Sequence, residues 1–506
     1  MTQFYNVCFL FLFISFQAAA QESINAKILD STSQKPIPFA TISINSNSGV
    51  ISNNNGEFLL YLRKKTSKKD SVIIRCLGYE SKRFLAKTFH DSIVFLSPKS
   101  IELDEVLVSN KNYTTEEIIE KTKENLATNY DFNFIKSKLF YRASYFTNVL
   151  KNDVKIKKTT IPEFNQVFID SLLIAMPKNS DDYIEILANM YGKSGTIDSQ
   201  KMDIIKASRL YDKSKEINFE SYEEKINSII KTHVKRDSYF KIKSGIFGTK
   251  QEIDSSFYDS EKPKKDETEA FIEEQKKKEK ERKENFLKYR KGSISRLQQN
   301  SFTFEDSDLN FLEKSNRYDF KLEDYSFLND DFVYIISFTP KRSEDYKGTI
   351  YINTDDFAII RVDYENVKNL RNFKLLGISY QHYLKRGTLI YEKNTNEKYA
   401  LKYAEEETGN KFGIKRPLKI IEKNKHTKGK RKQNELSSDI HFILSNREKK
   451  ELVVFENNPI TETIFTTFEE QPKVEPITLP KYDPEFWKGY NVIEPNQAIK
   501  DFKSIE

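Results

Sequence analysis

Five histidines are the residues of this chain best suited to hold a catalytic metal ion: His90, His233, His382, His426 and His441. A zinc peptidase needs such ligands at fixed spacing, as in His-x-x-Glu with a further His, or His-Glu-x-x-His. None of the five histidines has Glu three residues later, and the second pattern does not occur. We therefore predict no catalytic, cofactor-binding or metal-binding residue of this kind, and no zinc peptidase activity.

Gly192-Lys193-Ser194 is the sequence that comes nearest to the end of a phosphate-binding loop. Such a loop requires Gly five residues before Gly192, where this chain has Leu187. The segment is thus predicted to be an ordinary loop after a helix. A Gly-x-Ser-x-Gly nucleophile elbow is also absent from the sequence.

Asp355-Asp356 is a candidate pair of carboxylates for acid and base catalysis. Neighbouring residues in a hairpin turn point in different directions, and Asp favours turns by bonding its own backbone. Cys76 lies in an apolar segment, where it is expected to act as a small hydrophobic residue. These patterns favour a non-enzymatic protein, with an unrecognised hydrolase as the remaining catalytic alternative.

The composition limits the classes of protein that this chain can belong to. Its 506 residues are enough for two to four domains, and 38 Phe and 27 Tyr exclude wholesale disorder. Most of these rings must fill cores, although some could line a cleft for lipid or glycan. The net charge of +7 is too small, averaged over the chain, to require nucleic acid or an anionic membrane as partner.

Residues 1–20 have the pattern of a secretory signal peptide. The apolar run at 7–14 is too short to span a bilayer and is followed by Ala18-Ala19-Ala20, after which cleavage is expected. The run departs from the usual pattern because no Lys or Arg precedes it. Cleavage would leave Cys76 as the single cysteine, so the exported chain could form no internal disulfide. We expect export to the periplasm or association with the outer membrane, with no transmembrane helix after cleavage.

Residues 21–108 show short alternating segments separated by turn residues, which is typical of a β-sandwich. Asn53-Asn54-Asn55-Gly56 can supply the positive φ of a tight turn. Phe58, Ile74 and Tyr79 are expected in the core. The predicted strands lie at 24–29, 39–44, 58–62, 72–76 and 93–96.

An ordered series of motifs in this segment resembles the carboxypeptidase-regulatory-like domain, of the type found at the N-terminus of TonB-dependent receptors. The motifs are AKILD (26–30), KPIPFATI (35–42), Gly49, NNNGEF (53–58), LGYE (77–80) and LDEV (103–106). The resemblance covers about 85 residues and implies a seven-stranded transthyretin-like sandwich in a Gram-negative cell-envelope protein. Asn25 departs from it, since many members have Gly there. In carboxypeptidases this domain accompanies a separate zinc domain, so the name implies no activity here.

The rest of the chain divides by composition and period. Residues 109–260 are predicted to be mixed and mainly helical, with a capping box at Thr114-Thr115-Glu116-Glu117, a strand through Leu139 and Tyr141, and helices over most of 162–191 and 202–234. Residues 261–298 are rich in Lys and Glu and have too few apolar residues for one continuous buried face, which predicts an exposed helix or linker. Residues 299–470 alternate with period two and predict an antiparallel β region, and 471–506 form a Pro-containing tail.

The hairpin at 348–364 is the clearest element of the β region. Thr354-Asp355-Asp356 supplies its turn, and Val362 and Tyr364 share one face while Arg361 and Asp363 share the other. We expect the first face to be buried and the second wet. The order of strands here resembles the curved sheets of periplasmic carriers of lipids and lipoproteins.

These observations predict a β-rich α+β protein with an N-terminal sandwich, an α-rich middle and a C-terminal curved antiparallel sheet. The favoured function is a non-catalytic binding or assembly module of the cell envelope, without cofactor, whose partner is an envelope protein, lipid or glycan. The alternative is a periplasmic carrier or chaperone that holds lipid or lipoprotein on an aromatic-lined curved sheet. If the C-terminal sheet encloses an apolar cavity of a few hundred cubic ångströms with convergent polar groups, the carrier or an unrecognised hydrolase is favoured, whereas a filled core favours the binding module.

Overall fold

The structure is a computed structural model that describes residues 23–45, 48–62, 67, 69–99, 113–212, 220–252, 269–328, 331–426 and 431–504. The predicted signal peptide (1–20) and the LDEV motif (103–106) lie outside these residues. The chain forms two compact units. Unit 1 comprises the described residues within 1–101, 327–330 and 483–496, and unit 2 comprises those within 102–326, 331–482 and 497–506.

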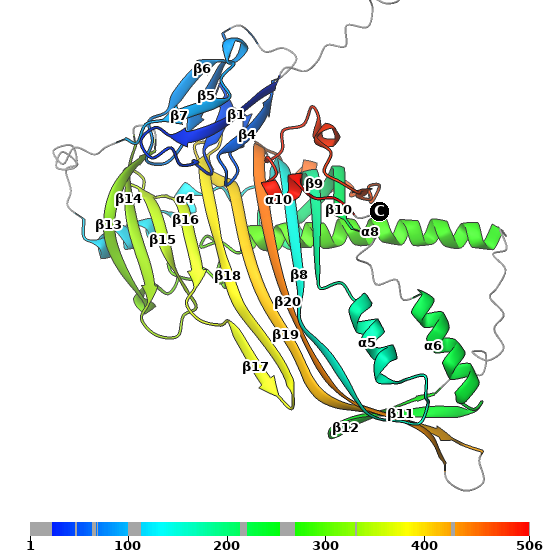
Figure 1. The fold of residues 1–506 in the computed structure, drawn as a ribbon. Helices are drawn as coiled ribbons and strands as arrows, with labels where there is room; N and C mark the ends of the chain where they lie inside the picture. Colours follow the sequence, from blue (N-terminus) through cyan, green and yellow to red (C-terminus); the bar gives the residue numbers. More distant parts are fainter. Residues whose placement is uncertain are drawn as a thin grey trace, which may run out of the picture. The chain divides into compact units, whose positions relative to one another are not determined.

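Unit 1 contains two β-sheets (Figure 1). One has the order β4 (Glu57–Tyr61), β1 (Ser23–Asp30), β7 (Ile93–Leu96), with β1 and β7 parallel. The other has the order β3 (Ser48–Ile51), β2 (Thr41–Ile44), β5 (Ser71–Arg75), β6 (Lys82–Leu85) and is antiparallel. A 3-10 turn, η1 (Ala86–Thr88), follows β6.

The core of unit 1 follows the alternation of its strands. In β1 every second residue is buried, and Phe58 and Ile74 are fully buried, as predicted. Tyr79 is half-buried, and its hydroxyl donates to Asp30 Oδ2 at 2.9 Å. Burial and the neighbouring carboxylate raise the pKa of Tyr79 to about 12. In the predicted tight turn, Asn53 Oδ1 accepts from two backbone N–H groups while Gly56 adopts φ +75°.

Residues 483–496, which the sequence assigned to the C-terminal tail, belong to unit 1. The backbone N–H of Tyr61 donates to Asn491 Oδ1 at 2.8 Å, and Trp487, Val492 and Ile493 are buried. The segment contains η5 (Pro484–Trp487). The tail is therefore packed here, because its apolar residues complete a small core.

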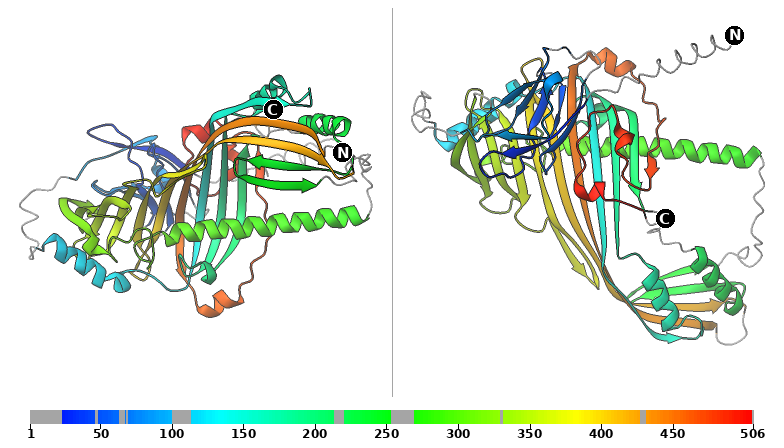
Figure 2. Two further views of the ribbon diagram at one scale, coloured as in Figure 1. Left: turned by 90° about the horizontal axis from the view of Figure 1, so that it is seen from below. Right: turned by 45° about the horizontal axis from the view of Figure 1, so that its top comes forward.

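Unit 2 is built around one large sheet (Figures 1 and 2). Adjacent strands from β14 to β10 run antiparallel, and β21 adds to β10 in parallel. Two short hairpin strands, β17 (Arg371–Leu375) and β11 (Ser238–Ser244), pair with β18 and β19, and β12 (Phe247–Glu252) pairs with β11. The main order is β13 (Tyr318–Leu328), β14 (Asp331–Pro340), β15 (Tyr346–Asn353), β16 (Ile359–Asn366), β18 (Ile378–Lys393), β19 (Tyr399–Asn424), β20 (Lys432–Pro459), β8 (Ile135–Thr159), β9 (Asn179–Gly192), β10 (Gln200–Tyr211), β21 (Ile477–Leu479).

The large sheet confirms the predicted antiparallel region, and its longest strands bend along their length (Figure 1). The β15–β16 hairpin forms as predicted, with Asp356 Oδ1 accepting from the N–H of Ala358 in the turn. Val362 and Tyr364 are buried, but Arg361 and Asp363 are only partly exposed and bond to each other. The face of the hairpin that carries Arg361 and Asp363 is thus less exposed to solvent than predicted.

The α-rich middle region is not confirmed. α3 (Thr115–Glu124) begins at the predicted capping box, and α5 (Gln166–Ala175) and α6 (Glu220–His233) are helices. However, β9 and β10 occupy the remaining predicted helical segments. The run from Tyr183 to Ala188 is buried on both faces, and such a strand has the continuous apolar pattern of a buried helix.

The charged segment at 261–298 corresponds to α8 (Glu269–Gln299), a 31-residue helix. Its residues 277–281 are exposed, as predicted, but Leu287, Ile294 and Leu297 are buried. A few apolar residues concentrated near its end are enough to anchor it. Shorter helices are α4 (Leu126–Asn129), η2 (Ile197–Ser199), η4 (Ser315–Arg317), α9 (Glu462–Thr467) and α10 (Gln497–Lys500). No helix in the described segments is long and apolar enough to cross a membrane.

Candidate binding site

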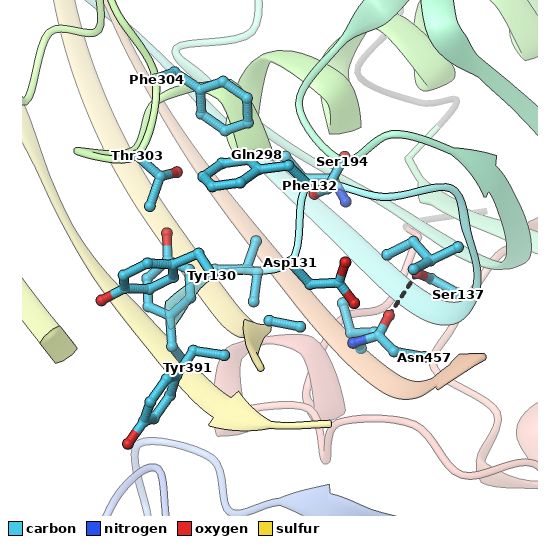
Figure 3. Close-up of a pocket in the computed structure, with 15 residues that line it drawn as sticks. Tyr130, Asp131, Phe132, Ser137, Ser194, Gln298, Thr303, Phe304, Tyr391 and Asn457 are labelled. Carbon is cyan, nitrogen blue, oxygen red and sulfur yellow. Dashed lines mark hydrogen bonds between the residues drawn. The ribbon is translucent and has the colours of Figure 1, made fainter. Parts of the chain in front are cut away.

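A pocket lies in unit 2 where six chain segments meet at one end of the sheet (Figure 3). It encloses about 500 Å³, including space open to solvent, of which about 30 Å³ can be occupied by water. That space holds one or two water molecules. The lining residues are Tyr130, Asp131, Phe132, Ile135, Ser137, Ser194, Gln298, Thr303, Phe304, Tyr391, Tyr399, Ala400, Leu401, Val454 and Asn457.

Aromatic rings form one wall of the pocket. Tyr130 follows α4 and packs edge-to-face on Tyr391, with ring centroids 5.4 Å apart, while its hydroxyl donates to the carbonyl of Ile359 at 2.7 Å. Burial raises the pKa of Tyr130 well above its usual value and that of Tyr391 to about 12, so both stay neutral. At the mouth, Phe132 is exposed and meets Phe304 edge-to-face at 6.5 Å.

Neutral polar groups complete the lining. Gln298 is only 4% exposed, and its Oε1 accepts from Gln200 Nε2 at 2.8 Å and from the N–H of Gly195. Ser137 donates to Asn457 Oδ1 at 2.6 Å (Figure 3). Within the described chain, neither amide nitrogen, Gln298 Nε2 nor Asn457 Nδ2, has a protein acceptor. The pocket therefore offers donors to a ligand.

The charged residue of the lining, Asp131, is already engaged. Its Oδ2 accepts from Asn394 Nδ2 at 2.6 Å, and its Oδ1 accepts from the backbone and side chain of Asn133. Such bonds hold the carboxylate in place and occupy both of its oxygens.

Gly192 is the last residue of β9, and Lys193 and Ser194 begin the loop to β10, so the motif follows a strand and not the predicted helix. Ser194 lines the pocket, and Lys193 Nζ lies 4.9 Å from the ring centre of Phe134. At Gly195, φ is +71° and a Cβ would lie within 3 Å of the Phe304 ring. The glycine lets the loop close against the aromatic wall.

The other sequence candidates are not among the residues that line the pocket. His233 bonds Glu163 at 2.9 Å, and Cys76 is buried in unit 1. Asp356 accepts from Tyr399 and pairs with Lys393, while Asp355 bonds within its own turn. Burial and then Lys385 lower the pKa of His382. Across the described ranges, no group of three or more His, Cys, Asp and Glu is placed to hold a metal ion.

The opposite face of the same sheet carries a row of charges that the sequence analysis missed. The residues are adjacent across β19, β20, β8 and β9 in the strand register. Arg142 donates to Glu185 at 2.8 Å and faces Glu451 at 3.8 Å. Lys449 pairs with Glu405 at 3.0 Å and Glu451 at 3.3 Å. We call Glu405, Lys449, Glu451, Arg142 and Glu185 the ion-pair row.

The pocket was also missed because its residues are far apart in the sequence. The signal that could have found it is the run Tyr130 to Phe134, in which aromatic residues alternate with Asp and Asn. Aromatic rings with amide and carboxyl neighbours are common in ligand sites. The same residue types also fill cores and turns, so the run alone is ambiguous.

Comparisons with known proteins extend these observations. Residues 24–108 match the family of CarboxypepD_reg-like domains. No curated protein matches the chain. Among solved structures, a LolA superfamily protein from Nitrosomonas europaea is 10% identical, with 70% of this chain and 99% of that one covered and a TM-score of 0.19.

Two further solved structures are similar at a comparable level. MucB in complex with MucA(peri) is 5% identical, with 65% and 94% of the two chains covered and a TM-score of 0.14. The Pseudomonas aeruginosa MucA/MucB complex is 5% identical, with 65% and 92% covered and a TM-score of 0.14. Similarity this low supports no conclusion about function. The match over 24–108 confirms the predicted resemblance of this segment to CarboxypepD_reg-like domains.

Proposed function

We propose that this chain is an exported, non-catalytic cell-envelope protein that binds another envelope component. The CarboxypepD_reg-like domain, whose two sheets we take to form a seven-stranded transthyretin-like sandwich, supports a place in the envelope. The observation that carries the proposal is the pocket lining. The amide nitrogens of Gln298 and Asn457 and the exposed ring of Phe132 can bind a ligand but do not transfer protons at neutral pH.

The pocket chemistry suits a neutral group that has both hydroxyls and an apolar face, such as a terminal sugar. Amide nitrogens would donate to its hydroxyl oxygens, and the Phe132 ring would pack on its apolar face. The roughly 30 Å³ open to water has room for one or two water molecules, so it admits a hydroxyl-sized group but neither an acyl chain nor a whole sugar ring. A terminal sugar would place a hydroxyl group in this space and keep its ring outside, against Phe132.

A pull-down from detergent-solubilised envelopes tests the proposal. Immobilised protein should retain a defined component, and Phe132→Ala, at the pocket mouth, should retain much less of it. Tyr289→Ala is the matched control, because Tyr289 is also an exposed aromatic residue but lies on α8 outside the pocket lining. Equal retention by both variants would show that the pocket is not the binding site.

Export and the absence of peptidase activity are tested separately. N-terminal sequencing of exported protein should begin near Gln21, and a chain that still carried Met1 would contradict export. Elemental analysis should find less than stoichiometric zinc, with no release of C-terminal residues from peptides. Tight stoichiometric zinc would contradict the non-catalytic assignment.

A carrier of lipid or lipoprotein is the second candidate, and one observation favours it. On β19 and β20, Phe412, Ile414, Phe442 and Leu444 share one face of the sheet and are only half-buried. An incompletely covered apolar face can hold acyl chains. If it does, lipid extracted from purified protein should be lost in Phe442→Glu, and lipid retained equally by that variant would exclude this face.

A further inference from the structure

One end of the large sheet is strongly basic. It comprises residues 149–178, 222–252, 367–383, 411–426 and 431–445, and we call it the distal lobe. The distal lobe contains 23 of the chain's 82 Lys and Arg residues but only 10 of its 75 Asp and Glu residues. The remainder of the chain is therefore net acidic, and the small overall charge conceals a local positive region.

The positive charges crowd around too few carboxylates. Glu435 is buried and lies close to Lys158, Lys419 and Lys432. Desolvation, followed by repulsion from Lys158 and Lys419, lowers the pKa of Lys432. No ion pair is recorded within the described chain for the exposed Lys243, Lys374 and Lys415. These charges are available to an external partner.

Two hairpin turns with exposed apolar side chains lie at successive positions along one edge of β19. The β17–β18 turn meets β19 where Lys415 N–H donates to the Gly377 carbonyl, and β11 pairs with β19 from Lys419 onward. Arg416 lies between the turns: it bonds Ser244, and its guanidinium lies 4.8 Å from the centre of the Phe247 ring. We call Ile246, Phe247, Leu375 and Leu376, with Arg416, the twin-hairpin patch.

The apolar residues of this patch protrude into solvent. Ile246 is 81% exposed, Phe247 55% and Leu376 51%. Leu376 also has φ +49°, followed by Gly377 at +80°, a turn in which Asn is much preferred to Leu. A branched apolar side chain is thus kept at a position that is strained and also exposed to water. Strained positions of this kind are common at functional surfaces.

We infer that the twin-hairpin patch docks on the surface of an anionic lipid bilayer. The apolar turn residues would enter the boundary between headgroups and acyl chains, and the surrounding lysines would contact anionic headgroups. Charge complementarity favours this partner, since apolar tips within a basic surface match a bilayer that is apolar inside and negative outside. The inference does not depend on the ligand of the pocket.

Vesicle co-sedimentation of the folded chain tests the inference. Binding should be clear on phosphatidylcholine vesicles that contain phosphatidylglycerol, weak on phosphatidylcholine alone, and reduced by added salt. Leu376→Asn combined with Phe247→Ser should lower the affinity for anionic vesicles by about tenfold, because two apolar side chains no longer insert. Lys415→Ala should lower it by about fivefold.

Matched controls separate docking from a general loss of structure. Leu376→Asn alone should keep or raise the melting temperature, since Asn suits the turn, and still weaken binding. Ile464→Ser and Lys347→Ala, at comparably exposed positions outside the distal lobe, should bind as the unaltered chain does. The inference is overturned if the folded chain does not sediment with anionic vesicles, binds neutral vesicles equally well, or is unaffected by the patch variants.

Discussion

Strand β8 passes through two environments that differ in how the sheet is covered. Residues 139–144 are buried at six consecutive positions, so both faces of the sheet are covered there. Beyond Leu150, exposed residues alternate with half-buried ones as far as Lys157. Near its start the strand contributes to a core, and in the distal lobe it presents one basic and one apolar face. The same strand thus provides rigidity at one end and a surface at the other.

The largest predicted difference between these regions concerns a charge placed on the apolar face. Val362 is fully buried, so Val362→Glu should lower the free energy of unfolding by several kcal/mol. Phe442→Glu in the distal lobe should lower it by about 1 kcal/mol, because water reaches that face. Urea unfolding of the full chain, monitored by limited proteolysis within unit 2, measures both losses. Equal losses would show that the distal face is covered as well.

Ion pairs provide the next comparison. Arg142 is 2% exposed and lies between two carboxylates, so Arg142→Met should cost about 3–5 kcal/mol because it removes a buried cation that faces both Glu185 and Glu451. Lys157 of the distal lobe pairs with Asp439 at 2.7 Å, but both are about half exposed. Lys157→Met should change stability by less than about 1 kcal/mol. A small effect at Arg142 would mean that the ion-pair row is hydrated.

Two glutamates on β19 should respond to pH in opposite directions. Burial and then repulsion from Glu451 raise the pKa of Glu405, despite its bond to Lys449. Burial would also raise the pKa of Glu407, but hydrogen bonds from Arg447 and Arg386 outweigh it and lower the pKa. Ionisation of Glu405 therefore lowers the free energy of unfolding as pH rises from 4.5 through its raised pKa. Protonation of Glu407 lowers the free energy of unfolding as pH falls from 4.5 through its lowered pKa.

Variants at these positions check the signs. Glu405→Gln should stabilise the chain at pH 7 by roughly 1 kcal/mol, and Glu407→Gln should destabilise it by a similar amount. The differences should shrink well below pH 4.5, where both side chains become protonated. Urea midpoints at several pH values measure this. Effects of the same sign at pH 7 would show that burial alone governs both residues.

Local signals predicted those parts of the fold that depend on neighbouring residues. Three elements formed as predicted: the capping box at Thr114 and Glu117, the turn at Gly56 and the β15–β16 hairpin. In each, residues close in sequence favour one local backbone conformation. Strand β9 was missed because Glu185 interrupts an apolar run in a way that suits a helix equally well. Its partner Arg142 lies 43 residues away, and nothing local indicates the pairing.

The functional surfaces were harder to predict for the same reason. The pocket draws Tyr130, Gln298 and Asn457 from segments more than 150 residues apart, and its donors become evident only when their partners are known. The distal lobe was overlooked because net charge was averaged along the chain. Strand pairing gathers lysines from five separate segments, so charge must be counted on a surface and not along a sequence.

The smallest predicted difference concerns aspartates on the polar face. Asp363 accepts two bonds from Arg361, at 2.8 and 3.1 Å, and one from Thr388 at 2.7 Å, whereas Asp439 of the distal lobe contacts Lys157. Substitution of a fully solvent-exposed residue would lower the free energy of unfolding by under about 0.5 kcal/mol. Because the bidentate bond fixes Arg361, Asp363→Asn should instead cost about 1 kcal/mol, and Asp439→Asn should stay under about 0.5 kcal/mol. A double-mutant cycle with Arg361→Met measures the coupling free energy between Asp363 and Arg361. A coupling near zero would show that Asp363 behaves as a solvent-exposed residue, as the alternation of the strand predicted.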